Sequence, residues 1–247
     1  MGLYRGVKSM SKLKLLSMSR FPHHRSGPSH ILPRNRQSGL VLIIFLLGVA
    51  ALLPAPVAEA APQDKARWDR KYQTEDYIFG KDPIPFLKEV SDLLPKRGQA
   101  LDLAAGEGRN AVFLATLGLD ITAIDISEEG LKKAKALARE RGVSIKTIAA
   151  DLESYRLPAK TYDVIVCTYY LQRDLIPKMK AALKPGGMIV METYTQDHHK
   201  YRPRFPQDYL LKPNELLKWF DDFVILRYQL VDDGQAVYAS ILAQKPG

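Results

Sequence analysis

Residues 101–115, LDLAAGEGRNAVFLA, constrain the fold of this chain more than any other segment. An apolar strand that contains Asp102 runs into a turn with glycines at positions 106 and 108, and a helix-like run follows. Because they lack a Cβ atom, Gly106 and Gly108 let the backbone turn sharply and lie against a flat ligand with its amide groups facing it. The segment therefore predicts a strand-to-helix turn that binds a nucleotide-like ligand.

An acidic residue follows each of the next two predicted strands. Residues 121–124, ITAI, lead to Asp125, nineteen residues after Gly106. This spacing is that of a βαβ unit whose carboxylate binds a ribose diol; the alternative is a turn acid before Ser127, a helix N-cap. Residues 145–149 lead to Asp151 and Leu152. Asp151 could accept a hydrogen bond from an adenine amino group while Leu152 packs on the ring, or Asp151 is a solvated loop acid.

The remaining elements complete one α/β sheet. A fourth strand at 162–167 is followed by a helix, and LKPGG at 183–187 ends that helix before a strand at 188–192. Residues 223–228 and 236–242 predict two strands joined through Asp-Asp-Gly at 232–234, which is a hairpin signal. Helices are predicted over 86–94, 109–117 and 127–141. We expect an α/β fold with a doubly wound, seven-stranded, mostly parallel sheet and a C-terminal antiparallel hairpin.

With these motifs in order, residues 68–244 resemble the class I S-adenosylmethionine-dependent methyltransferases. LDLAAGEG is similar to their first cofactor motif, AID to their ribose acid, AADL to their adenine acid, and LKPGG to the turn before their fifth strand. WDRKY, YIFG, YYLQRDL and RPRFPQDYLLKPNELL resemble the small bacterial enzymes related to tellurite-resistance and thiol S-methyltransferases. One departure is Ala104, where the family usually has glycine. The glycines also fit an NAD-binding Rossmann fingerprint, but the closing hairpin favours a methyltransferase.

The resemblance implies S-adenosylmethionine as cofactor and a small molecule as methyl acceptor. The aromatic residues Trp68, Tyr72 and Tyr77 would form a lid over the methionine end of the cofactor, with ordinary packing as the alternative for each. Arg109 and Asn110 would reach the cofactor carboxylate or the substrate, or serve only as first-turn residues. The expected cofactor-binding residues are Trp68, Tyr77, Asp102, Ala104, Gly106, Gly108, Arg109, Asn110, Asp125, Ile126, Asp151, Leu152, Cys167 and Thr168.

The acceptor side is expected after the fourth strand and in the loop at 194–211. Methyl transfer from a sulfonium is an in-line displacement, so the protein must hold the acceptor close and exclude water. The candidate residues are Tyr169, Tyr170, His198 and Arg204, with His198 as a base and Arg204 or Arg202 as an oxyanion ligand. Solvated loop residues are the alternative for His198 and His199. No metal site is expected at these adjacent histidines, and Cys167 is expected to be a buried small residue rather than a nucleophile.

The amino-terminal part differs from the rest in composition. Residues 1–38 contain eight of the 36 Lys and Arg and none of the 27 Asp and Glu, so the remainder is nearly neutral and predicts no nucleic-acid partner. The unbroken apolar run at 39–53, with Ala-Glu-Ala at 58–60, predicts a cleaved signal peptide or, if uncleaved, a membrane anchor through residues 39–58. Either would export the domain at 63–247 from a bacterial cytoplasm or anchor it at the inner membrane, whereas a start downstream of the apolar run would leave it cytoplasmic.

These observations predict a monomeric enzyme that methylates a thiol, a chalcogen oxyanion or a similar small acceptor. A protein that binds S-adenosylmethionine without turnover is the main alternative. A nucleic-acid methyltransferase is disfavoured because Cys-Thr-Tyr-Tyr at 167–170 is unlike the Asn-Pro-Pro-Tyr step of those enzymes.

Overall fold

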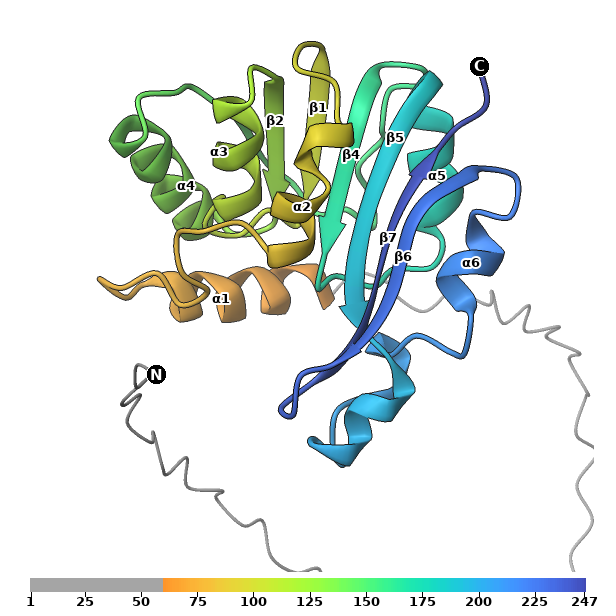
Figure 1. Cartoon of the computed structure of the whole chain (residues 1–247). Coiled ribbons are helices and arrows are strands. Elements are labelled where there is room, and N and C mark those ends of the chain that lie inside the picture. The colour runs from red at the N-terminus through yellow and green to blue at the C-terminus, as the bar shows by residue number, and fades with distance from the viewer. Residues whose placement is uncertain (1–59) are drawn as a thin grey trace, which may run out of the picture. The chain divides into compact units, whose positions relative to one another are not determined.

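A seven-stranded sheet forms the centre of the computed structural model, which describes residues 60–247 (Figure 1). The strand order is β3-β2-β1-β4-β5-β7-β6. Strands β1 to β5 pair in parallel, whereas β7 pairs antiparallel with both β5 and β6. The bounds are β1 (Gln99–Leu103), β2 (Asp120–Asp125), β3 (Lys146–Ala149), β4 (Tyr162–Thr168), β5 (Leu183–Tyr194), β6 (Val224–Asp232) and β7 (Val237–Gln244). The expected fold class and the closing hairpin are confirmed.

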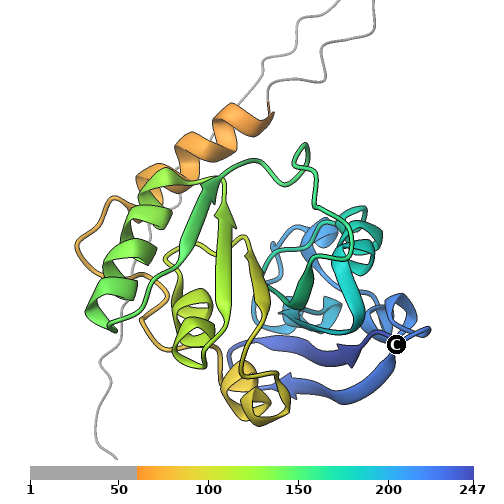
Figure 2. The same cartoon turned by 90° about the horizontal axis from the view of Figure 1, so that it is seen from above.

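Helices cover both faces of this sheet (Figure 2). They are α1 (Ala60–Tyr72), α2 (Pro85–Glu89), α3 (Arg109–Thr116), α4 (Glu128–Glu140), α5 (Leu175–Ala182) and α6 (Glu215–Trp219), with 3-10 turns η1 (Ser91–Leu93), η2 (Gln196–Lys200) and η3 (Gln207–Tyr209). Helix α4 begins as predicted, because the Ser127 hydroxyl accepts a hydrogen bond from the Gly130 amide at 3.1 Å.

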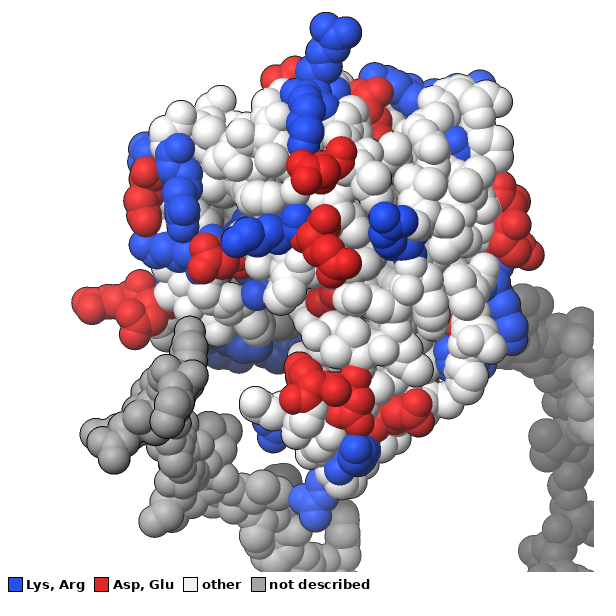
Figure 3. All heavy atoms as spheres, in the orientation of Figure 1, with Lys and Arg blue, Asp and Glu red and all other residues white. Residues whose placement is uncertain are grey.

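Two hydrophobic cores lie on opposite faces of the sheet. Leu101, Ile165 and Ile241 face α5 and α6, while Val164, Val190 and Leu242 face α2 and α3. Strands buried on both faces read as continuous apolar runs, which is why β1 and β4 were recognisable in the sequence. On the face drawn in Figure 3, Lys and Arg lie interspersed with Asp and Glu around a largely uncharged central area.

Two local predictions were wrong. The helix expected over 86–94 ends at Glu89 and continues as η1, so Leu93 is 40% exposed and does not belong to the core. The LKPGG segment lies inside β5 rather than before it, since Leu183 already pairs with Tyr162 and a register irregularity precedes the next pair, Val164 with Met188.

The predictions for the amino-terminal leader, residues 1–38, and for the apolar segment that follows it concern residues outside the described part of the chain. Within residues 60–247, no helix has the length and apolar character needed to cross a membrane.

Candidate functional site

The predicted glycine turn connects β1 to α3 with left-handed backbone angles. Gly106 has φ +53° and Gly108 has φ +82°. A Cβ atom at position 108 would lie 2.4 Å from the Cβ of Ala134 in α4, so the turn packs closely on that helix. Ala104 also has a left-handed φ of +53°. The departure from the family pattern therefore places an alanine at a strained position, at a cost of about 1–2 kcal/mol.

Buried carboxylates lie beside this turn. Asp102 is 1% exposed, its Oδ2 has no hydrogen-bond partner among the described residues, and burial raises its pKa to about 7. Asp125 accepts hydrogen bonds from the amides of Gly106 at 2.7 Å and Ser127 at 2.8 Å. These are the contacts of a turn acid, and they hold the carboxylate against the glycine turn, where a ribose acid would lie. The ribose contact itself stays a prediction.

The third acidic position follows β3 at the same edge of the sheet. Asp151 accepts a hydrogen bond from the amide of Glu153 at 2.9 Å, and Leu152 is 5% exposed. Ile126, between Asp125 and the α4 cap, is half-buried. The four predicted positions therefore lie where neighbouring parallel strands end, and their contacts with an adenosine stay predictions.

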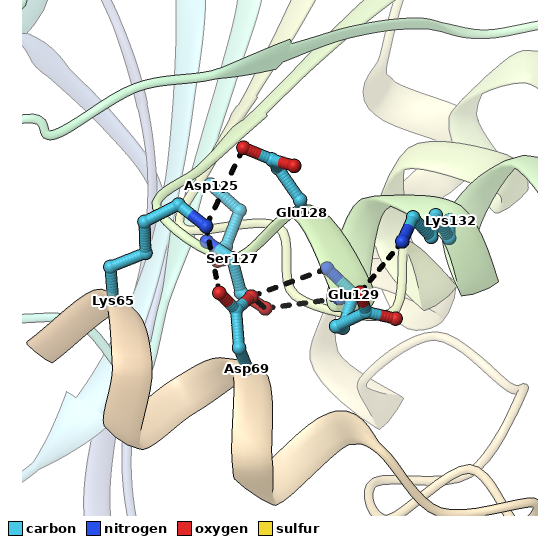
Figure 4. Close-up of polar contacts among 8 residues, drawn as sticks. Lys65, Asp69, Asp125, Ser127, Glu128, Glu129 and Lys132 are labelled. Carbon is cyan, nitrogen blue, oxygen red and sulfur yellow. Dashed lines mark hydrogen bonds and ion pairs between the residues drawn. The ribbon is translucent and has the colours of Figure 1, made fainter.

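Helix α1 runs across this edge, below the ends of the strands in Figure 1. A Cβ atom on Gly106 would lie 2.6 Å from the Tyr72 hydroxyl, and Tyr72 itself is 5% exposed. Asp69 accepts hydrogen bonds from the Ser127 hydroxyl at 2.7 Å and the Glu129 amide at 3.3 Å (Figure 4). Trp68 stacks on Tyr72 with ring centroids 5.5 Å apart. The helix thus lies where the lid was predicted, but its anchor, Asp69, was missed.

A second clamp holds the segment after α1. Glu107, 3% exposed, accepts hydrogen bonds from the amides of Ile78 and Phe79 at 3.2 and 3.3 Å and pairs with Lys133 at 2.9 Å. Tyr77 donates its hydroxyl to the Lys133 carbonyl at 2.9 Å, which is the packing role considered as its alternative. Sequence reasoning missed Glu107, whose only signal was its place between the two glycines.

Arg109 and Asn110 connect the glycine turn to the segment at 79–84 and to the end of β4. Arg109 donates to the Phe79 carbonyl at 2.9 Å. The Asn110 side chain accepts from the Ile84 amide at 3.0 Å and donates to the Thr168 hydroxyl at 3.0 Å, so it joins α3 to the end of β4. Cys167 is 1% exposed, and burial raises the pKa of its thiol to about 12. The thiol is therefore neutral at physiological pH, in accordance with the expected packing role.

Tyr169 lies at the carboxyl end of β4 in a left-handed conformation, with φ +55°. Its amide donates to the carbonyl of Glu192 at 2.7 Å, and its hydroxyl donates to the Glu192 Oε1 at 2.7 Å. Ser240 donates to the other oxygen, Oε2, at 2.6 Å. Glu192 is 1% exposed, and burial raises its pKa. Sequence reasoning missed Glu192 and Ser240; the available signal was a carboxylate inside the apolar run MIVMETY.

An aromatic cluster of Tyr169, Tyr194, His198 and Phe205 extends from this group. Tyr194 lies 5.0 Å from Tyr169 and 4.2 Å from His198 between ring centroids, and Phe205 packs edge-on at 5.5 Å from Tyr194. His198 is 4% exposed, so its interpretation as a solvated loop residue was wrong. Burial, with the nearby Arg202 charge, lowers its pKa, and its Nδ1 has no partner among residues 60–247.

Of the other acceptor-side candidates, Arg202 lines a hollow beside this cluster, whereas Tyr170 has different contacts. Tyr170 donates to Gln172 at 2.8 Å and packs against the core on the α5 and α6 side. Arg204 is exposed, whereas Arg202 lines a hollow of about 410 Å³ that is open to solvent. The residues that line this hollow are Tyr194, His198, Arg202, Phe205, Asp233, Gln235 and Ala236. His199 contacts the Phe205 carbonyl at 2.8 Å, and the described residues contain no group of three side chains placed to bind a metal ion.

Several known proteins are similar to this chain. Residues 100–187 match the family described as methyltransferase domain. Hemagglutinin 1 of Eikenella corrodens is 29% identical over 169 residues, which are 60% of this chain and 55% of that protein. The ubiquinone biosynthesis O-methyltransferase of Burkholderia orbicola is 30% identical over 139 residues, 49% of this chain and 60% of that protein. The chain spans roughly half to two thirds of the curated relatives that it matches.

A further relative agrees in both sequence and structure. The probable S-adenosyl-L-methionine-dependent methyltransferase TehB of Haemophilus influenzae is 29% identical over 139 residues, 53% of this chain and 47% of that protein. The crystal structure of TehB from the same organism has a TM-score of 0.54 at 24% identity, over 73% of this chain and 66% of that one, which concerns the fold. Residues 100–187 therefore match a methyltransferase domain, and the described fold, with its sheet order and glycine turn, is similar to that of TehB.

Proposed function

We propose that this protein transfers a methyl group from S-adenosylmethionine to a small-molecule acceptor. The observation that carries the proposal is the pair of buried carboxylates, Asp102 and Asp125, packed against a glycine turn with left-handed angles. Asp102 offers an unpartnered oxygen at that turn, which suits a ligand with amino or hydroxyl donors. When bound, S-adenosylmethionine supplies a methyl group activated by its sulfonium.

The residues of this chain would form a cofactor side and an acceptor side. Gly106, Gly108 and Asp125 would hold the sugar and the amino-acid part of the cofactor, and Asp151 with Leu152 would hold the adenine. The aromatic cluster and Tyr169 would exclude water and position the acceptor, which can supply much of the rate acceleration. The name of one relative, an O-methyltransferase, supports an oxygen nucleophile as acceptor, and the resemblance of the sequence to tellurite-resistance and thiol S-methyltransferases supports a soft one.

Titration calorimetry with S-adenosylmethionine tests the cofactor assignment. We expect Asp125→Ala to weaken binding by more than about tenfold, because two hydroxyl donors lose a charged acceptor. Asp120→Ala is the matched control, because it removes an exposed carboxylate from the opposite end of the same strand. An unchanged affinity in Asp125→Ala would sink the assignment. Tight binding without release of S-adenosylhomocysteine from mixtures with thiols, selenite or tellurite would indicate a binding protein instead.

We propose in addition that residues 1–60 export this domain or anchor it in the inner membrane of a bacterium. The support is the acid-free basic stretch followed by the apolar run at 39–53. A translation start downstream of that run would leave the protein in the cytoplasm, where S-adenosylmethionine is made.

A further inference from the structure

We infer that Glu192, acting through the Tyr169 hydroxyl, takes the proton from an aromatic hydroxyl group on the methyl acceptor. The inference rests on the proposed function and names the acceptor class: a phenol or catechol. It starts from the three-residue group of Tyr169, Glu192 and Ser240, which joins the end of β4 to β5 and to the middle of β7. The register of β5 with β7 pairs Glu192 directly with Ser240.

Glu192 is a buried carboxylate without a cationic partner at ion-pair distance among the described residues. The hydroxyls of Ser240 and Tyr169 donate to its two oxygens at 2.6 and 2.7 Å. A charge buried in this way is costly, and a neutral side chain would anchor Tyr169 at lower cost. The raised pKa that burial causes makes the carboxylate a stronger base than a solvated glutamate.

Tyr169 links this buried carboxylate to the surface. The residue is 39% exposed, although its hydroxyl donates to Glu192. Its φ of +55° is strained for a bulky residue, and such strain concentrates at functional sites. Burial and the nearby Glu192 charge raise the pKa of Tyr169, so its hydroxyl stays protonated. While it donates to Glu192, the hydroxyl oxygen can still accept a hydrogen bond from a second donor.

The proton transfer is balanced within these groups. The acceptor O–H bond breaks, its proton passes to the Tyr169 Oη, and the proton of Tyr169 passes to the Glu192 Oε1. The electron pair stays on the acceptor oxygen, so a phenolate and a neutral glutamic acid form together. An oxyanion such as selenite is already ionised and needs no such base.

The surroundings favour a planar acceptor. Tyr169, Tyr194 and His198 present successive rings with centroids 5.0 and 4.2 Å apart, and Phe205 closes one side. An aromatic acceptor would add one more ring at the usual stacking distance. Besides Tyr169, the titratable groups near Glu192 on the packed elements are Arg109, Tyr194 and Tyr238, and the Arg109 guanidinium partly opposes the rise in the Glu192 pKa that burial causes.

The test uses 4-nitrophenol, whose anion has its own absorption band, and the full chain saturated with S-adenosylhomocysteine, so no turnover occurs. Below the pKa of the free phenol, we expect binding to raise the ionised fraction by at least about tenfold, which corresponds to one pKa unit. Glu192→Gln should abolish this change. Glutamine retains an oxygen for the Tyr169 hydroxyl and offers an amide donor to the Ser240 oxygen, so the geometry persists while the base is lost.

Tyr169→Phe provides an independent test, because it leaves Glu192 in the sheet and interrupts the proton path. We expect this variant also to lose the increase in ionised 4-nitrophenol. Glu89→Gln and Tyr228→Phe are matched controls on exposed positions of α2 and β6, and should behave as the unmodified protein. An unionised phenol in the unmodified protein, or an unchanged band in Glu192→Gln, would overturn the inference. So would loss of the band in His198→Asn but not in Glu192→Gln, since the base would then be His198.

The two proposals fail in different measurements. Absence of S-adenosylmethionine binding by calorimetry would refute the proposed function. Normal cofactor binding together with an unionised 4-nitrophenol would refute only the role of Glu192.

Discussion

Replacing Gly108 by alanine should destabilise this protein strongly, for two separable reasons. The left-handed φ of +82° costs an L-residue about 1–2 kcal/mol. The new Cβ would lie 2.4 Å from the Ala134 Cβ and 2.9 Å from the Ala134 Cα, and overpacking against backbone that cannot rotate away costs about 1–3 kcal/mol. Alanine also lowers the conformational entropy of the unfolded chain, which offsets the destabilisation by about 0.4–1 kcal/mol. We therefore expect a loss of about 1–5 kcal/mol in the free energy of unfolding, centred on about 3 kcal/mol.

Two other glycines separate the cost of backbone strain from the cost of overpacking. Gly142, at the end of α4, has φ +70° and nothing within 4 Å of its missing Cβ, so Gly142→Ala should cost only about 1 kcal/mol of strain. At Gly106 the new Cβ would meet the Tyr72 hydroxyl at 2.6 Å, the tip of a side chain rather than backbone. Gly106→Ala should therefore fall between the other two, and Tyr72→Phe in the same chain should recover part of the loss.

Urea unfolding of the full chain, followed by circular dichroism, gives these free energies from the midpoint and the slope. The slope should stay constant across the series, because the surface exposed on unfolding does not change. A Gly108→Ala protein as stable as Gly142→Ala would refute the role of the Ala134 contact, since that contact would then carry no energy. An unchanged stability of Gly106→Ala after Tyr72→Phe would refute the contact with the Tyr72 hydroxyl.

Three further predictions concern charge, loop and leader. The Asp102 pKa of about 7 lies above its ordinary value of 3.8, so the stability associated with its protonated form is present below pH 4 and lost as the pH rises through 7, by at most roughly 4 kcal/mol. Asp102→Asn should remove this pH dependence, and urea midpoints at pH 5 and pH 8 that change equally in both proteins would contradict it. Arg173 donates to both Glu215 oxygens at 2.8 and 3.1 Å and to the carbonyls of Asp208 and Leu210. Because lysine cannot reproduce this fork, Arg173→Lys should speed tryptic cleavage at 200–212, and an unchanged cleavage rate would argue against it. Mass spectrometry of the amino terminus from the native host should show either cleavage after Ala60 or the intact apolar run; a terminus near residue 57, from a downstream translation start, would exclude both.

The cofactor side of this domain was predictable because its signals are local in sequence. A glycine turn, the acids after β2 and β3, and the Ser127 cap each depend on a few neighbouring residues, and backbone geometry allows few alternatives at such turns. Parallel pairing then places the ends of adjacent strands at one edge, which is why Asp102, Asp125 and Asp151 could be grouped without coordinates.

The acceptor side was not predictable in this way. Glu192 and Ser240 are 48 residues apart, and their contact depends on β7 inserting between β5 and β6 rather than adding at the edge. Asp69 reaches the α4 cap from 58 residues away, and His198 became buried because Tyr194 and Phe205 pack on it. The sequence alone therefore determined the sheet, the glycine turn and the place of the predicted cofactor residues at one edge, since these follow from short-range backbone preferences. Only the tertiary structure decided which polar side chains share one buried environment, because that depends on long-range packing.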